Sequence, residues 1–461
     1  MRKHILIALA ALALVTTGCR DGARKDFNRM LVELAASDQT IDGKDWKQIA
    51  DYLDSNKAHF KDFFEDGELD AGAVKEYITD FFAHRRPPKE IRFTGIGGDE
   101  LAFHIYLERS GSMAPYDSRD GDGSFRAAIM ALQNNLPGKA QIDSIGEKGY
   151  TDFRQIFDNI LNKTGDNQVS ILVTDMIYSV KDMAGVNPQK VFSEVQEMIN
   201  AVFKDEVRKK SMLVVRMTGS YNGPYYAYDN SVHHFSGRRP YYIIIVGSND
   251  NIVRLTHDVT LRTFSEMQNL RGYDNMCLFT ADDIYEPYYS FLLSNKDIRG
   301  RFQPERGQDT QITRLEGVEP DKDSGDIQLA LAVDLGKMFV DERYLTQVGN
   351  YVVEADDEVK IKEIRRIEKG DMSPAERKYA GTATHLFILS ATRVSHPQEV
   401  KVKLLNRLPE WAGSGSTDND LTPDGQTTFA LRYLLGGIYD SYKRNADSEP
   451  TYFELQLQLD K

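Results

Sequence analysis

The chain has 461 residues, of which 41% are hydrophobic and 28% are charged, and its formal net charge is −13. This length predicts two to four domains, and the composition is that of a soluble globular protein. The negative charge argues against a nucleic-acid partner, because phosphates would be repelled unless one face of the protein were basic.

The first segment has the layout of a targeting signal. Residues 1–4 include Arg and Lys, residues 5–15 form an apolar run that is too short to span a membrane, and Gly18-Cys19 follows. The pattern over residues 1–18 resembles a bacterial lipoprotein signal. This resemblance implies that Cys19 is lipidated and that the protein is anchored in the cell envelope. A plain secretory peptide cut near Gly18 is the alternative.

Two further expectations concern the cysteines. Arg20 follows Cys19 at a position where an acidic residue would favour retention in the inner membrane, so we expect the outer membrane. Once Cys19 carries lipid, Cys277 is the only remaining thiol and no intramolecular disulfide is possible. Cys277 stands among apolar residues and is predicted to be a small buried side chain.

A polar tether over residues 19–26 leads into a helical module over residues 27–88. The module contains two similar units, with Asp42 and Asp70 at matching positions. The two units resemble degenerate EF-hand-like helix-loop-helix repeats. Neither loop has the alternating acids and the terminal Glu that calcium binding requires. We therefore expect Asp42 and Asp70 to cap helices and the module to serve as a packing unit, with calcium binding as the disfavoured alternative.

The central region, residues 98–295, alternates strand and helix patterns. This alternation predicts an α/β domain with a mainly parallel sheet and helices on both faces. Strands are predicted near 101–107, 140–145, 169–174, 212–217 and 241–247, and helices near 124–135, 152–163 and 188–203.

Polar side chains gather where these strands end. An apolar run stops at Glu108, which is followed at every second position by Ser110 and Ser112. Thr151 precedes a predicted helix, and Asp175 ends another apolar run. Ligands of open α/β sheets bind beyond the carboxyl ends of the strands. Carboxylates and hydroxyls make an all-oxygen set, which suits Mg²⁺, Ca²⁺ or Mn²⁺.

The order of these residues resembles the von Willebrand factor A family, whose metal-ion-dependent adhesion site uses Asp-x-Ser-x-Ser, a distant Thr and a later Asp. The resemblance covers residues 98–295 and implies a Rossmann-like domain in which Ser110, Ser112, Thr151 and Asp175 hold a divalent cation. It also implies that the cation accepts an acidic group of a protein or other macromolecular partner.

The first acid departs from the family pattern, because Glu108 stands where the family has Asp. Glutamate is one methylene longer, so Glu108 ligates the cation directly, ligates it through water, or points elsewhere. The alternative to a metal site is that Ser110, Ser112 and Thr151 are turn and helix-cap residues, with Asp175 an ordinary acid at the end of a strand.

A tyrosine-rich segment, residues 221–228, lies between two predicted strands. Its composition is typical of recognition loops, and Tyr221, Tyr225 and Tyr226 are predicted to contact the partner. The segment leaves from the edge that carries Asp175, so we expect it to overhang the metal. The alternative is a loop that packs its rings inward.

Residues 297–461 show apolar residues at alternate positions, bounded by Gly, Asp and Asn clusters. This pattern predicts an antiparallel β-sandwich-like domain, with one helix near residues 429–438. No catalytic motif is present in the chain, and no catalytic residue is predicted. Two alternatives to metal-dependent binding stay open: a structural part of an envelope assembly with a non-functional metal site, or, less favoured, a metal-assisted hydrolase.

Overall fold

The structure is a computed structural model of the chain. It describes residues 22–36, 39–41, 43–65, 67–85, 89, 91–93, 101–134, 136, 140–146, 151–178, 186–204, 206–257, 261–308, 310–446 and 449–461. The signal-like segment, the lipidation candidate Cys19 and the cap candidate Asp42 lie outside these residues.

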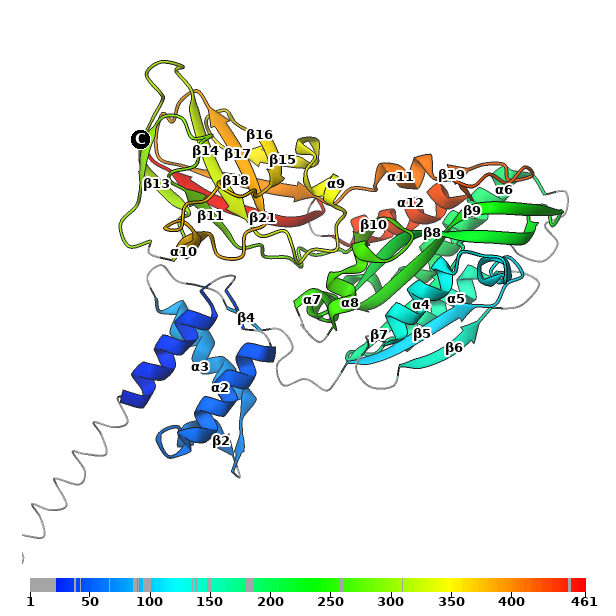
Figure 1. Cartoon of the computed structure of the whole chain (residues 1–461), viewed down its shortest axis with the longest axis horizontal. Helices are drawn as coiled ribbons and strands as arrows, with labels where there is room; N and C mark the ends of the chain where they lie inside the picture. The colour runs from blue at the N-terminus through cyan, green and yellow to red at the C-terminus, as the bar shows by residue number, and fades with distance from the viewer. Residues whose placement is uncertain are drawn as a thin grey trace, which may run out of the picture.

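The N-terminal residues form a small helical unit with an apolar core of its own (Figure 1). A helix over residues 22–34 packs with α2 (Gly43–Ser55) and α3 (Ala71–Ala83). Asp70 caps α3, as the sequence predicts, by accepting hydrogen bonds from the N–H groups of Gly72 and Ala73. Short strands close the unit: β1 (Thr40–Ile41) pairs with β4 (Arg92–Phe93), and β2 (Phe64–Glu65) with β3 (Glu68–Leu69).

The central domain is built on a six-stranded sheet in the order β10-β8-β9-β7-β5-β6. Its strands are β5 (Ala102–Glu108), β6 (Gln141–Ile145), β7 (Gln168–Thr174), β8 (Lys210–Tyr226), β9 (Val232–Ser248) and β10 (Tyr273–Phe279). β5 pairs in parallel with β6 and β7, as expected, whereas the pairings among β7, β9, β8 and β10 are antiparallel. The expected mainly parallel sheet is therefore a mixed one, because β8 and β9 form a hairpin instead of a crossover.

Helices cover both faces of this sheet, which makes three layers. Alternate residues of each strand point to opposite faces, so Ile243 and Ile245 join one core and Ile244 and Val246 the other. The first core is completed by α4 (Ser124–Asn134), α7 (Asn249–His257) and α8 (Arg262–Ser265). The second core is completed by α5 (Phe153–Lys163), α6 (Pro188–Val202), α11 (Glu410–Ser414) and α12 (Leu431–Asn445).

The last two of these helices come from a distant part of the sequence. Residues 410–445 were expected within the β-rich region, but α11 and α12 lie on the central domain (Figure 1). A Cβ at Gly437 would lie 3.2 Å from the Ile199 side chain, so the glycine lets α12 approach α6 closely. Without α12, part of the apolar face formed by Ile244 and Val246 would be exposed.

The C-terminal domain is a β-sandwich of two sheets, as the alternation predicts. One sheet has the order β11 (Tyr289–Leu292), β14 (Ile327–Val333), β17 (His385–Ala391), β16 (Val359–Arg366). The other has the order β12 (Arg301–Pro304), β13 (Arg314–Glu319), β21 (Thr451–Leu459), β18 (Gln398–Leu405), β15 (Tyr351–Glu354). Their pairings are antiparallel except for β13 with β21. The sandwich starts at β11, a few residues before the expected boundary at residue 297.

No helix within the described residues has both the length and the apolar composition needed to cross a bilayer.

The packing of α12 generates a stability prediction. Leu435 is fully buried against the central sheet, so Leu435→Ala should lower the free energy of unfolding by about 2–5 kcal/mol through lost burial and an unfilled cavity. Denaturant unfolding followed by circular dichroism measures this change. The control is Asp440→Ala on the exposed side of the same helix, for which a change within about 0.5 kcal/mol is expected. A loss for Leu435→Ala no larger than that of the control would contradict the packing.

Candidate functional site

The predicted site residues meet at the carboxyl-terminal edge of the parallel strands. β5 ends at Glu108, and its neighbour β7 ends one residue before Asp175. Thr151 directly precedes α5, whose N-terminus is capped by Asp152. All five candidates are described and buried, with exposed fractions of 5% for Glu108, 7% for Ser110 and Ser112, 2% for Thr151 and 1% for Asp175.

Glu108 points into this cluster. The Thr151 hydroxyl donates to Glu108 Oε1 at 2.6 Å, and the Thr174 hydroxyl donates to Oε2. Ser110 Oγ and Ser112 Oγ lie 2.9 Å apart and share a hydrogen bond. The longer side chain therefore does not remove Glu108 from the site; its carboxylate lies beside Thr151, as the motif requires.

Only one carboxylate oxygen of Asp175 has a hydrogen-bond partner among the described residues. Its Oδ1 accepts a hydrogen bond from the Ile177 N–H at 3.1 Å, but its buried Oδ2 has no hydrogen-bond partner among the described residues. The next residue, Met176, has a φ of 56°, in the left-handed region that non-glycine residues rarely occupy. Such strained conformations persist where the surrounding structure imposes them, and they cluster at functional sites.

Two buried carboxylates this close disfavour each other's charge. Burial and the charge of Asp175 raise the pKa of Glu108 to about 7, against the hydrogen bonds from Thr151 and Thr174. Burial also raises the pKa of Asp175, opposed by the nearby Ser112 hydroxyl and by the Ile177 N–H. A cation between the carboxylates would remove this repulsion.

A buried arginine lies near the acids. Arg239 of β9 is 1% exposed, donates to the Asp424 carbonyl at 2.9 Å, and lies over the Tyr225 ring at 4.3 Å. Its charge lowers the pKa of Asp175, but the two side chains form no ion pair in the structure. Only the alternation of buried residues through β9 points to its inward position.

The tyrosine-rich segment is a β-hairpin instead of a loop. β8 continues through it to Tyr226 and stays paired with β9 as far as Val232. β7 and β8 are both antiparallel to β9, so they run in the same direction and the hairpin projects from the edge that carries the candidate site. The turn between the two strands contains Asn230, whose φ is 67°.

The tip of the hairpin overhangs the site, as we expected. A Cβ on Gly111, between the two serines, would lie 2.9 Å from the ring of Tyr226. The predicted contact role of the other tyrosines is not supported, because Tyr221 and Tyr225 are each 1% exposed. Tyr226, at 40% exposure, is the only one of the three whose ring is available to a partner.

Asp420, between α11 and α12, forms hydrogen bonds to the other side of this hairpin. The Tyr225 hydroxyl donates to Asp420 Oδ2 at 2.5 Å, and the Tyr228 N–H donates to Oδ1 at 3.0 Å. Asp420 is 2% exposed. Local sequence patterns could not reveal this contact, because Tyr225 and Asp420 are 195 residues apart.

The donor set decides which ions fit. The described residues contain no group of three or more His, Cys, Asp and Glu side chains placed to hold a metal. The candidate site has two carboxylates, and its remaining oxygen atoms are hydroxyls of Ser110, Ser112 and Thr151. The orphaned Oδ2 of Asp175 and the like-charged pair with Glu108 fit a hard divalent cation such as Mg²⁺, Ca²⁺ or Mn²⁺.

Cys277 lies in β10, is 4% exposed, and has no disulfide. Burial raises the pKa of its thiol well above the usual range, so it is an inert buried side chain, as the sequence predicts.

Comparisons with protein-family models, with curated proteins and with solved structures gave no match.

Glu108 generates a pH prediction for the cation-free protein. Its pKa of about 7 lies above the ordinary 4.5, so between these values the folded protein binds more protons than the unfolded chain. The free energy of unfolding in chelator should therefore fall as pH rises from about 4.5 to about 7, by on the order of 1–3 kcal/mol.

Denaturant unfolding across this pH range measures the effect. Glu108→Gln removes the titrating group and should reduce the slope, whereas Glu197→Gln, on the exposed side of α6, should keep it. Stability that rises over the same interval, or an unchanged slope in Glu108→Gln, would show that the Glu108 pKa is not raised.

Proposed function

We propose that this protein is a cell-envelope lipoprotein that binds a protein or other macromolecular partner through a divalent cation held in a von Willebrand A-like domain. Glu108, Ser110, Ser112, Thr151 and Asp175 would hold the cation, and lipid on Cys19 would anchor the chain to the membrane, with the outer membrane as the expected location.

One observation carries this proposal. Two carboxylates from neighbouring parallel strands, Glu108 and Asp175, are buried together with three hydroxyls, and one carboxylate oxygen has no donor. Burying charge without compensation is costly, and folds rarely keep such an arrangement unless it serves a site. Structural turn and cap residues explain single serines and threonines, but they do not explain the buried acid pair.

A bound divalent cation would supply a concentrated positive charge in an acidic protein, to which a carboxylate of the partner can bind. The chain itself contributes the hairpin tip. Tyr226 lies over Gly111 and is partly exposed, so a partner that reaches the cation would touch its ring. The paired residue Val232 is 58% exposed and extends this apolar edge.

A bound cation should reverse the effect of Asp175→Asn on the free energy of unfolding. In chelator, Asp175→Asn should leave the free energy of unfolding unchanged or raise it, because it removes a poorly satisfied buried charge. With Mg²⁺, Ca²⁺ or Mn²⁺ at about a hundredfold over its Kd, the wild type should gain about 3 kcal/mol and the variant much less.

Thermal unfolding with and without each cation tests this reversal. Asp152→Asn, which keeps a helix cap beside Thr151, should respond to the cations as the wild type does. A wild type that none of the three cations stabilises would remove the metal from the proposal.

Partner binding can be measured with the lipid-anchored protein in envelope extract. Recovery of a specific partner should be lost in chelator, restored by the cation, lost in Asp175→Asn and reduced in Tyr226→Ser. Met130→Ser is the control, because Met130 is a large exposed apolar side chain outside the hairpin. Recovery that neither chelator nor Asp175→Asn changes would favour the structural alternative. Ester or phosphate hydrolysis that Asp175→Asn abolishes would favour the hydrolase.

A further inference from the structure

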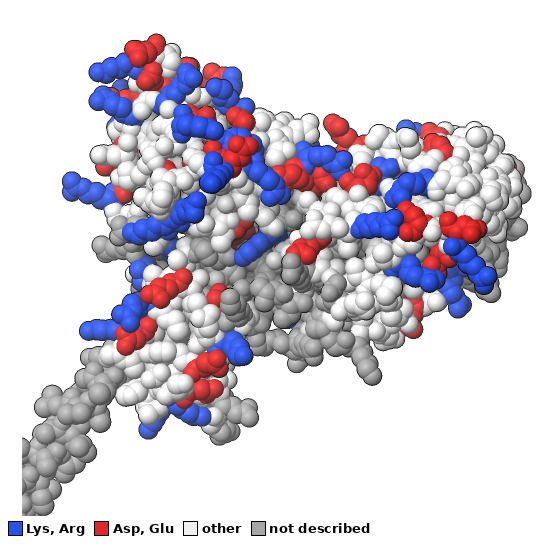
Figure 2. Space-filling model, in the orientation of Figure 1, with Lys and Arg blue, Asp and Glu red and all other residues white. Residues whose placement is uncertain are grey.

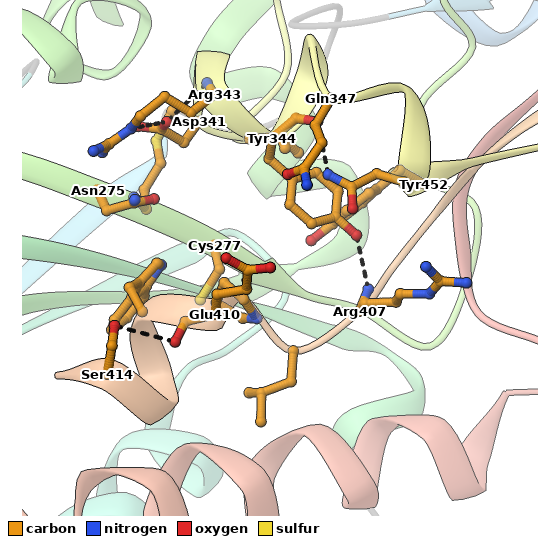
Figure 3. A pocket seen from close by; sticks show the side chains of 16 residues that line it. Asn275, Cys277, Asp341, Arg343, Tyr344, Gln347, Arg407, Glu410, Ser414 and Tyr452 are labelled. Carbon is orange, nitrogen blue, oxygen red and sulfur yellow. Dashed lines mark hydrogen bonds and ion pairs between the residues drawn. The ribbon is translucent and has the colours of Figure 1, made fainter. Parts of the chain in front are cut away.

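A second cavity lies where the sandwich meets the central domain, and it shares no residue with the candidate cation site. Its volume is about 420 Å³, which is within the range of small-molecule sites. Four parts of the chain line it (Figure 3): the edge strand β10, the segment 340–350 that contains α9 (Glu342–Leu345), the segment 407–414 that leads into α11, and Tyr452 of β21.

The floor of this cavity is apolar and well buried. Met276 and Cys277 of β10, Val340, Tyr452 of β21 and Trp411 of α11 are all at most 7% exposed. The Trp411 indole N–H has no acceptor among the described residues. The floor therefore offers a surface for an apolar side chain.

The rim of the cavity carries two basic and two acidic side chains. Only Arg343 and Asp341 form an ion pair with each other. Arg343 donates to Asp341 at 2.8 Å and to the Asp274 carbonyl. Arg407 and Glu410 are exposed residues at the mouth of the cavity, and neither forms an ion pair with any described residue. The Arg407 guanidinium donates to the Gly349 carbonyl at 3.2 Å.

These two unpaired charges lie on different sides of the cavity. Figure 3 shows the Glu410 carboxylate and the Arg407 side chain apart from each other, and the Arg407 backbone N–H donates to the Tyr344 hydroxyl at 3.3 Å. Figure 2 shows acidic and basic side chains intermingled where the sandwich and the central domain meet. A ligand with a single charge would therefore leave one of the two rim charges without a counter-charge.

We propose that this cavity binds a small zwitterion with an apolar side chain, that is, a free amino acid or a short peptide with both ends free. The ligand carboxylate pairs with Arg407, its ammonium group pairs with Glu410, and its side chain lies on the floor around Trp411. Arginine is suited to the carboxylate, because its planar fork of donors matches the two oxygens.

The test compares three probes by isothermal titration calorimetry with the purified full chain. L-Phenylalanine carries both charges, N-acetyl-L-phenylalanine only the carboxylate, and L-phenylalanine amide only the ammonium group. L-Phenylalanine should bind at least about tenfold more tightly than either blocked form, because each blocked form leaves one rim charge unpaired.

Two variants assign the charges. Arg407→Gln should weaken binding of L-phenylalanine and the N-acetyl form while leaving the amide unchanged. Glu410→Gln should weaken binding of L-phenylalanine and the amide while leaving the N-acetyl form unchanged. Arg377→Gln, at an exposed arginine of α10 (Arg377–Ala380), is the matched control and should change none of them.

Three results would overturn the proposal: blocked forms that bind as tightly as L-phenylalanine, charge variants that behave like the control, or no binding of L-phenylalanine at concentrations up to about 10 mM. The proposal does not depend on the cation site. Asp175→Asn and chelator should therefore leave this binding unchanged, and either proposal can fail alone.

Discussion

The burial of two acids at the ends of adjacent strands is the constraint on which the candidate site depends. β5 and β7 pair in parallel and stop within one residue of each other, so Glu108 and Asp175 lie at the same edge of the sheet. Hydroxyl donors from Thr151 and Thr174 reduce the cost of burying Glu108, and one backbone N–H does the same for Asp175. These donors do not fully compensate the negative charge of the two acids, which lie below the hairpin tip. Water is largely excluded there, so the electrostatic attraction to a cation would be strong.

The β8–β9 hairpin covers this edge, and Asp420 and Asp424 form hydrogen bonds to the hairpin. Tyr226 approaches Gly111 so closely that no larger residue fits between the serines without moving the ring. On its other side the hairpin is fixed by Asp420 and by the carbonyl of Asp424, which accepts from Arg239. Residues that are far apart in sequence thus converge on one edge, and the central domain is incomplete without the segment between β18 and β21 of the sandwich.

Local patterns in the sequence were sufficient for the elements that build the site. The apolar runs before Glu108 and Asp175, and the helical spacing after Thr151, predicted β5, β7 and α5 within one or two residues. Their convergence also followed, because the ends of parallel strands meet at one edge. The longer side chain of Glu108 left its direction open in the sequence, and the hydrogen bond to Thr151 shows that it faces the cluster.

Long-range pairing was beyond the reach of those patterns. The glycine, proline and asparagine of the segment from Tyr221 to Tyr228 are typical of loops, yet β8 and β9 pair through it because tertiary contacts outweigh local preference. The apolar spacing in residues 431–438 predicted a helix correctly but carried no information about which sheet that helix covers.

The return of residues 407–445 to the central domain places two sites on one segment. Its first part, Arg407 to Ser414, lines the cavity at the junction, and its later part contains Asp420 and Asp424, which hold the hairpin over the candidate cation site. The apolar face of the sheet requires α12 as a cover, so the connection from β18 to α12 must cross both regions on its way. The sandwich is therefore joined to the central domain by a segment that buries Trp411 and Asp420 and is hydrogen-bonded to the hairpin, and not by a free linker. A chain that needed only to tether two independent domains would not bury Trp411 and Asp420 to do so, and this burial is the physical basis for treating the two domains as one working unit.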